Sequence, residues 1–249
     1  MHGGEISTTA LDRLGAATPK WARWVRTGTH SAIVTASAPR AGGTSTRTYQ
    51  LRVMLRESSI VVIEQGASLL PSFCPERHIN GDRSFCLGLR AGQITYASDA
   101  TSRWWNKLAV FLSCQDSAHE SRMWPEQAQL THGEEGAELE IEAEVLAADL
   151  GMTREYMVAL REKQGSLYAV ARRADLSANR VRNGRAQCIC RRKDKGGCPL
   201  LRRQCWKAEH PCLAVIEGRR QSAEAAYWAT VRKRRCCGTL DECPLRKHR

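Results

Sequence analysis

The chain has 249 residues and a formal net charge of +12, from 38 lysines and arginines against 26 aspartates and glutamates. This length allows one large domain or two smaller ones with a sizeable core. No apolar stretch is long enough to span a bilayer, and the N-terminus lacks the charged-then-apolar pattern of a secretion signal. We therefore expect a cytoplasmic protein without a membrane partner, in which the eleven cysteines indicate metal binding or catalysis rather than disulfides.

The first part of the chain has the patterns of three β-strands. Residues 30–38 form a short apolar, β-branched stretch, and residues 39–43 supply proline and glycine for a turn. From residue 49 to 56, apolar and polar residues alternate, which is typical of a half-buried antiparallel strand. Residues 59–64 are more uniformly apolar and predict a buried strand. Together these segments predict an antiparallel meander.

A cysteine follows a His-x-Asn tripeptide in the loop after these strands. Residues 73–87 read Phe-Cys-Pro-Glu-Arg-His-Ile-Asn-Gly-Asp-Arg-Ser-Phe-Cys-Leu. A thiol such as that of Cys86 suits acyl transfer, because it is partly ionised near neutral pH and is a good leaving group. The amide of Asn80 can donate to an oxyanion or brace the loop. The structural alternative is that Cys86 is a small buried residue on a strand after the turn.

This segment resembles the active-site segment of ubiquitin-conjugating enzymes, in which a His-Pro-Asn tripeptide precedes a cysteine that carries the ubiquitin C-terminus as a thioester. The middle residue is Ile79 here instead of proline, and the interval from asparagine to cysteine is two residues shorter than the usual eukaryotic spacing. Both departures resemble the divergent bacterial members found in ubiquitin-like conjugation operons. The residues that match the family order are His78, Asn80, Ser84, Phe85, Cys86 and Leu87.

The resemblance implies an α+β protein with a ubiquitin-conjugating-like domain, in which Cys86 is the acceptor and Asn80 the oxyanion stabiliser or loop brace. It assigns His78 a mainly structural role. It also implies three partners: a ubiquitin-like protein, its activating enzyme and a metal-dependent isopeptidase, in systems often linked to phage defence. The acyl group would then pass to an amine or hydroxyl of a target.

Downstream of the cysteine, residues 102–115 are predicted to form an amphipathic helix that covers the sheet, because Trp104, Leu108, Phe111 and Leu112 recur at helical spacing. The family also has a tryptophan in this region, which Trp104 or Trp105 matches. Residues 134–150 fit both a helical and an alternating pattern, and their Ala/Glu/Leu-rich composition favours a helix.

Charge and cysteine content both change in the second half of the chain. Residues 154–249 contain 24 lysines and arginines against 9 aspartates and glutamates, whereas the preceding residues contain 14 against 17. We therefore expect a boundary near Gly151, with a ubiquitin-conjugating-like domain at 1–150 and a basic, cysteine-rich module at 151–249. Short helices are predicted at residues 153–164 and 166–175.

The cysteines of this module can supply thiolates to structural zinc, which would give a polar segment folding free energy that its core cannot provide. Two sets of four are expected: Cys188, Cys190, Cys198 and Cys205, and then Cys212, Cys236, Cys237 and Cys243, with His210 as an alternative ligand. Neither set has paired Cys-x-x-Cys knuckles. The alternative is a group of free, partly buried thiols.

Three further interpretations stay open. The basic module could bind nucleic acid through a helix-like stretch at 166–185 that carries Arg172, Arg173, Arg180, Arg182 and Arg185, although no base-reading motif is present. The protein would then be a zinc-stabilised regulatory protein without catalytic activity. A Cys-His hydrolase would pair Cys86 with His78 or His132 as base. For the transfer step, Asp82, Asp99 or Asp116 could assist the attacking amine.

Overall fold

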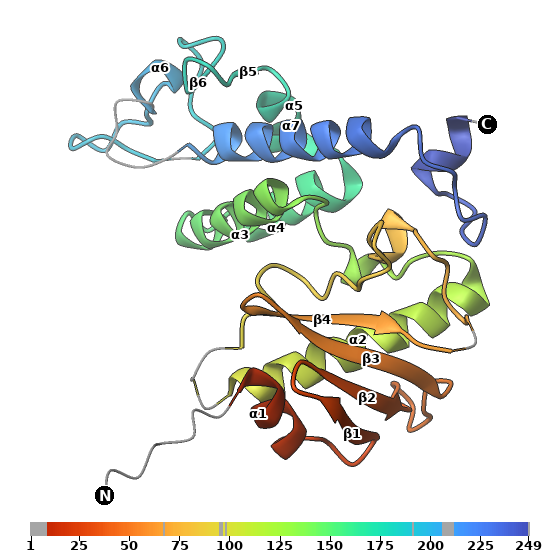
Figure 1. The fold of residues 1–249 in the computed structure, drawn as a ribbon. Helices are drawn as coiled ribbons and strands as arrows, with labels where there is room; N and C mark the ends of the chain where they lie inside the picture. The colour runs from red at the N-terminus through yellow and green to blue at the C-terminus, as the bar shows by residue number, and fades with distance from the viewer. Residues whose placement is uncertain are drawn as a thin grey trace, which may run out of the picture. The chain divides into compact units, whose positions relative to one another are not determined.

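The computed structural model describes residues 9–66, 68–94, 97, 99–190, 192–205 and 212–248, without the side chains of residues 205, 247 and 248 (Figure 1). The chain forms two compact units. The first consists of Met1–Gln129 together with Lys233–Arg249, and the second of Leu130–Arg232. Within the second unit, the helix over residues 134–149 packs against the helix over residues 213–231. The domain boundary expected near Gly151 stays a prediction. The C-terminal residues belong to the first unit.

The first unit contains a four-stranded antiparallel sheet in the order β1(Ala22–Gly28), β2(Ser31–Ala36), β3(Tyr49–Arg56) and β4(Ser59–Glu64) (Figure 1). The three predicted strands are confirmed as β2, β3 and β4. Strand β1 was not predicted. It lies at the edge of the sheet and is more exposed than its neighbours, so its arginines interrupt the apolar pattern on which a strand prediction depends.

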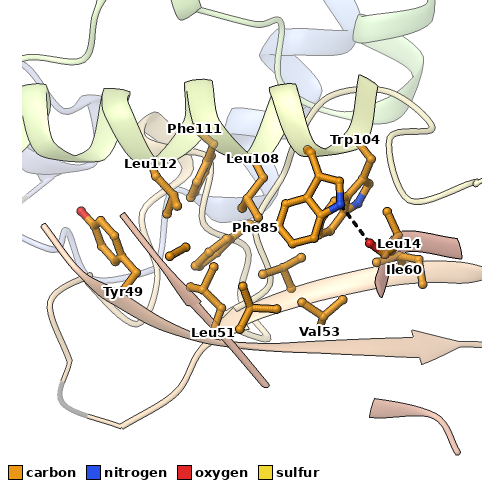
Figure 2. Close-up of a cluster of buried hydrophobic side chains, with 14 of the residues drawn as sticks. Leu14, Tyr49, Leu51, Val53, Ile60, Phe85, Trp104, Leu108, Phe111 and Leu112 are labelled. Atoms are coloured by element: carbon orange, nitrogen blue, oxygen red, sulfur yellow. Dashed lines mark hydrogen bonds between the residues drawn. The ribbon is translucent and has the colours of Figure 1, made fainter. Parts of the chain in front are cut away.

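One face of this sheet is covered by α2(Ala100–Ser121), which confirms and extends the predicted helix (Figure 1). Figure 2 shows Trp104, Leu108, Phe111 and Leu112 directed from this helix toward side chains of β3 and β4. The short helix α1(Ala10–Ala16) closes one end of the core, where the indole N–H of Trp105 donates to the carbonyl of Leu14 at 3.1 Å. Burial of these aromatic and aliphatic side chains supplies the hydrophobic stabilisation of the unit.

The segment between β4 and α2 carries the 3₁₀ helix η1(Pro75–Arg77) and the cysteine-bearing loop. The first unit also contains the 3₁₀ helices η2(Glu126–Ala128) and η4(Pro244–His248). This α+β architecture is the one expected from the sequence. None of the helices in the described part of the chain has both the length and the apolar composition needed to cross a membrane.

The second unit is mainly helical. It contains α3(Glu134–Asp149), α4(Thr153–Met157), the π-helical turn η3(Val158–Glu162), α5(Gly165–Ala171), a hairpin of β5(Ala174–Asp175) and β6(Arg180–Val181), α6(Arg202–Cys205) and α7(Leu213–Val231). Helices α3 and α7 lie side by side (Figure 1). The helix expected at 134–150 is confirmed.

One expectation for this unit needs correction, and one helix was not predicted. The helix-like stretch at 166–185 ends at Ala171, and the chain then turns through the β5–β6 hairpin, which has Asn179 in the left-handed region at φ 50°. The five arginines proposed for nucleic-acid contact therefore do not share one helix. Helix α7, the longest of this unit, was not predicted from the cysteine-rich sequence around it.

A buried ionic network packs inside the second unit. Glu217 is fully buried, and the guanidinium of Arg220 donates to both of its carboxylate oxygens at 2.7 and 2.8 Å. Arg220 also donates to Thr131 at 3.0 Å and to Glu224 at 2.9 Å. These bonds raise the pKa of Arg220 against the lowering effect of burial, so the cation is retained.

Candidate functional site

The backbone of the loop holds Cys86 beside His78. The amide of Cys86 donates to the carbonyl of His78 at 2.8 Å, and the neighbouring amide of Phe85 donates to Val62 of β4 at 2.9 Å. Ile79 forms bridges both to Cys74 and to Phe85. These contacts make a small three-segment sheet that extends from β4 and fixes the backbone on which the thiol is carried.

Cys86 itself is half-buried, with its two neighbours on the N-terminal side, Ser84 and Phe85, buried beneath the surface. A half-buried thiol can be reached by a reacting partner while its surroundings limit its motion. Cys114 of α2, by contrast, has the environment of a structural core cysteine. It is buried, and burial raises the pKa of its thiol.

The side chain of Asn80 is exposed at the turn that precedes Cys86. Its amide nitrogen donates to the hydroxyl of Ser84 at 2.9 Å, and that hydroxyl donates to the carboxylate of Asp82 at 2.6 Å. Asp82 in turn accepts a hydrogen bond from Arg56 at 2.8 Å. An asparagine amide has two N–H donors, so one can brace Ser84 while the other is offered to a substrate.

His78 is buried, with its backbone in the left-handed region at φ 53°. Its ring meets the indole of Trp124 edge-on, with the ring centroids 5.2 Å apart. Because the imidazole is packed inside the unit, its environment suits the structural role expected for it better than that of a general base. His132, the other histidine considered as a base, belongs to the second unit and lies beside Tyr227 and Trp228.

The three aspartates considered for the transfer step have different environments. Asp82 lies on the loop, where burial alone would raise its pKa but hydrogen bonds from Ser84 and Arg56 lower it overall. Asp99 is the N-cap residue of α2 and pairs with Arg103 in the first turn of that helix. Asp116 is buried and accepts from Tyr49 and Arg47, and these bonds lower its pKa against the effect of burial. Asp82 is therefore the one among them that shares the loop of Cys86.

A group of four thiols lies behind the same loop. The Sγ atoms of Cys74 and Cys237 are 3.2 Å apart, Cys74 also contacts Cys243, and Cys243 contacts Cys236. Hydrogen bonding to Cys74 lowers the pKa of Cys237 to about 5 and that of Cys243 to about 6, whereas the pKa of Cys74 is raised by the same contacts. Cys74 was not predicted to be a member of this group, because Cys236, the nearest other member in the sequence, lies 162 positions away.

The expected zinc ligands are grouped differently by the structure. Cys236, Cys237 and Cys243 belong to the first unit and meet Cys74, whereas Cys212 packs against the apolar cluster of the second unit that contains Cys188 and Cys190. The Sγ atoms of Cys188 and Cys190 are 3.0 Å apart. The expected set of Cys212 with Cys236, Cys237 and Cys243 is divided between the two units, and it stays a prediction.

The other ligands of the first expected set differ in environment. Cys198 is exposed, while the side chain of Cys205 and all of His210 lie outside the described residues. Among the described residues, no three histidine, cysteine, aspartate or glutamate side chains already have the arrangement of a metal site. Cysteine thiolates are the side chains to consider as zinc ligands in this protein, because structural zinc is commonly bound by four of them in a tetrahedron.

The sheet, the helix across it and the cysteine-bearing loop define the first unit as a ubiquitin-conjugating-like, or E2-like, domain. Family comparison agrees: residues 21–126 match the model described as a prokaryotic E2 domain, and residues 131–245 match a cysteine-rich domain that lies C-terminal to the E2 domain. The chain therefore belongs to the E2-like bacterial family with a cysteine-rich module. No curated protein and no solved structure matches the chain significantly.

Proposed function

We propose that this protein is a conjugating enzyme that carries the C-terminus of a ubiquitin-like protein on Cys86. The observation that supports this most strongly is the half-buried Cys86 on a hydrogen-bonded loop within the region that matches a prokaryotic E2 domain. The proposal assigns an activating enzyme as the donor and a ubiquitin-like protein as the cargo.

In the first step, the Cys86 thiolate attacks the carbonyl carbon of the thioester that joins the ubiquitin-like protein to the activating enzyme. A new carbon–sulfur bond forms as the old one breaks, and the cysteine of the activating enzyme leaves as a thiolate. The exchange is nearly isoenergetic, so the loop mainly has to provide proximity and a donor for the oxyanion. Asn80 is the candidate for that donor.

In the second step, an amine or hydroxyl of a target attacks the thioester on Cys86, which leaves as a thiolate. The proton of the attacking group must pass to a base or to water. Asp82 is our candidate for assisting this step, because it shares the loop with Cys86 and its carboxylate can accept a hydrogen bond from the attacking group. Its lowered pKa makes it a weak base, so it would orient that group while water takes the proton.

The cysteine-rich module is proposed to bind zinc, because coordination would protect its thiols from oxidation and would contribute folding free energy. The contact between Cys188 and Cys190, with Cys212 in the same cluster, supports a site in the second unit. A role in phage defence, with a metal-dependent isopeptidase as a further partner, is the biological setting that this proposal adopts.

A trapping experiment tests the carrier role. The full-length protein, its activating enzyme and the ubiquitin-like protein are incubated with ATP, and adducts are resolved with and without thiol. Wild type should give a thiol-sensitive adduct, and Cys86→Ser a thiol-resistant, alkali-labile ester. Cys114→Ser is the matched control, because it removes a buried thiol of α2 and should behave as wild type. Normal conjugation by Cys86→Ala would refute the proposal.

A further inference from the structure

The C-terminal residues from 233 onward form part of the first unit and contact the segment that leads into the Cys86 loop. The guanidinium of Arg234 lies 4.8 Å from the centroid of the Phe73 ring. The guanidinium of Arg77 donates to the hydroxyl of Thr239 at 3.1 Å. These contacts bring the C-terminal segment against η1 and the start of the loop.

A second attachment lies at the C-terminal end of α2. The side chain of Arg122 pairs with Asp241 at 2.9 Å, and the amide of Asp241 donates to the carbonyl of Arg122 at 3.0 Å. The paired side chains are about half exposed, so this ion pair contributes little stability by itself. The same segment also buries Leu240 and Leu245, which are 2% and 4% exposed, so apolar packing contributes to its attachment within the first unit.

Four cysteines lie at the junction of these two segments. Cys74 and Cys243 are almost completely buried, Cys236 is buried and Cys237 is half-buried. Their sulfurs contact one another in the sequence Cys237, Cys74, Cys243 and Cys236. Ordinary core cysteines are dispersed among apolar side chains, whereas these are gathered with each other.

A buried cation adjoins this group. Arg77 is 1% exposed, and its Nε and Nη2 atoms donate to the side chain and carbonyl of Gln115 at 2.8 and 3.1 Å. Neither acceptor is charged, so these bonds solvate the guanidinium without neutralising it. A zinc ion with four thiolates carries a net charge of −2, which would be the compensating anion that a buried arginine requires.

We propose that Cys74, Cys236, Cys237 and Cys243 bind one zinc ion, which joins the C-terminal segment to the Cys86 loop. The donor set has the number and type of ligands that structural zinc prefers. Sulfurs that share a tetrahedral zinc with bonds of about 2.3 Å lie about 3.8 Å apart. The Cys74 and Cys237 sulfurs, at 3.2 Å, would move apart by about half an ångström, which side-chain rotation can supply.

The position of Cys74 gives the site a consequence for the loop. Its amide donates to the carbonyl of Ile79 at 3.1 Å, the amide of Ile79 returns a bond of 3.0 Å, and Ile79 bridges to Phe85. A metal on Cys74 would therefore restrain the small sheet that carries Cys86. This effect on conjugation depends on the proposed carrier role, but the metal site itself does not.

Metal content per chain tests the site. Full-length protein and single variants are purified without chelator, and bound zinc is measured by elemental analysis. Cys74→Ser and Cys237→Ser should each lose about one zinc ion per chain relative to wild type. Cys114→Ser and Cys86→Ser, which change thiols outside the group, should lose none. If Cys86→Ser keeps its zinc and loses conjugation, the metal site and the carrier role are separated.

A conservative variant guards against loss of metal through misfolding. Cys74→His keeps a zinc ligand and should retain the metal, and cobalt-substituted Cys74→His should show weaker thiolate-to-cobalt charge-transfer absorption than cobalt-substituted wild type. Equal zinc content in Cys74→Ser, Cys237→Ser and Cys114→Ser would overturn the proposal. So would a Cys74–Cys237 disulfide found by mass spectrometry in protein that was purified under reducing conditions.

Discussion

The side-chain amide of Asn80 donates to the hydroxyl of Ser84 at 2.9 Å, two residues before Cys86 of the E2-like loop. The same hydroxyl donates to Asp82, which accepts from Arg56 of β3. The orientation of Asn80 therefore depends on a chain of hydrogen bonds that reaches the central sheet. A side chain held in this way loses less conformational entropy when it meets an oxyanion.

The first prediction separates the two roles considered for Asn80. Asn80→Ala should slow discharge of the Cys86 adduct to an amine by about 10²–10³-fold, the usual cost of losing one oxyanion donor. Ser84→Ala removes the partner of the amide but leaves the donor, so its effect should be much smaller. Single-turnover discharge assays measure both rates. Equal losses in the two variants would instead indicate that Asn80 only braces the loop.

The second prediction concerns pH and Asp116. Hydrogen bonds from Tyr49 and Arg47 hold the pKa of this carboxyl below its unfolded value of about 3.9. The ionised carboxylate of Asp116 therefore stabilises the folded protein fully above that pH, and this stabilisation is lost as pH falls through the lower pKa that the group has in the folded protein. Asp116→Asn should cost about 1.5–3 kcal/mol at pH 7 and progressively less below pH 4. Urea unfolding across this range measures the difference, and a cost independent of pH would contradict the assignment.

The third prediction concerns the ionic network of the second unit. Arg220→Ala leaves Glu217 buried without its bidentate partner, and should destabilise this unit by about 3–5 kcal/mol. Arg219→Ala, one position earlier on α7 and exposed, should change stability by less than about 0.5 kcal/mol. Hydrogen exchange of the α7 amides localises the effect. Similar protection in both variants would show that the network contributes little.

The fourth prediction tests how α2 packs on the sheet. Leu108 lies on the face of α2 that packs on the sheet and is completely buried. Leu108→Ala should lower the free energy of unfolding by about 2–5 kcal/mol, through lost burial and the cavity it leaves. Val110, two residues further on, is 58% exposed, so Val110→Ala should be close to neutral. Thermal unfolding of both variants measures the contrast. A large loss in the second variant would mean that its face of α2 is covered by another surface.

Much of the first unit could be predicted from its sequence, because the relevant signals are local. The alternation through β3 reflects one face packed on the core, and the spacing of apolar residues through α2 reflects one helical face on the sheet. The order of residues around Cys86 was sufficient to identify the E2-like family. Strand β1 was not predicted, because its exposed arginines interrupt the alternating pattern. Helix α7 was not predicted, because its many small residues and mixed polarity weaken the helical spacing of apolar residues.

The sequence by itself determined the class of domain and the loop that carries Cys86. Only the tertiary structure decided that residues 233–249 join the first unit, that Cys74 meets Cys237, and that Arg220 is buried against Glu217 and Glu224. The physical reason is that periodicity reports which side of an element is buried, but not which distant segment covers it. A contact between residues 163 positions apart depends on how whole elements pack against one another, and this packing cannot be read from short-range patterns in the sequence.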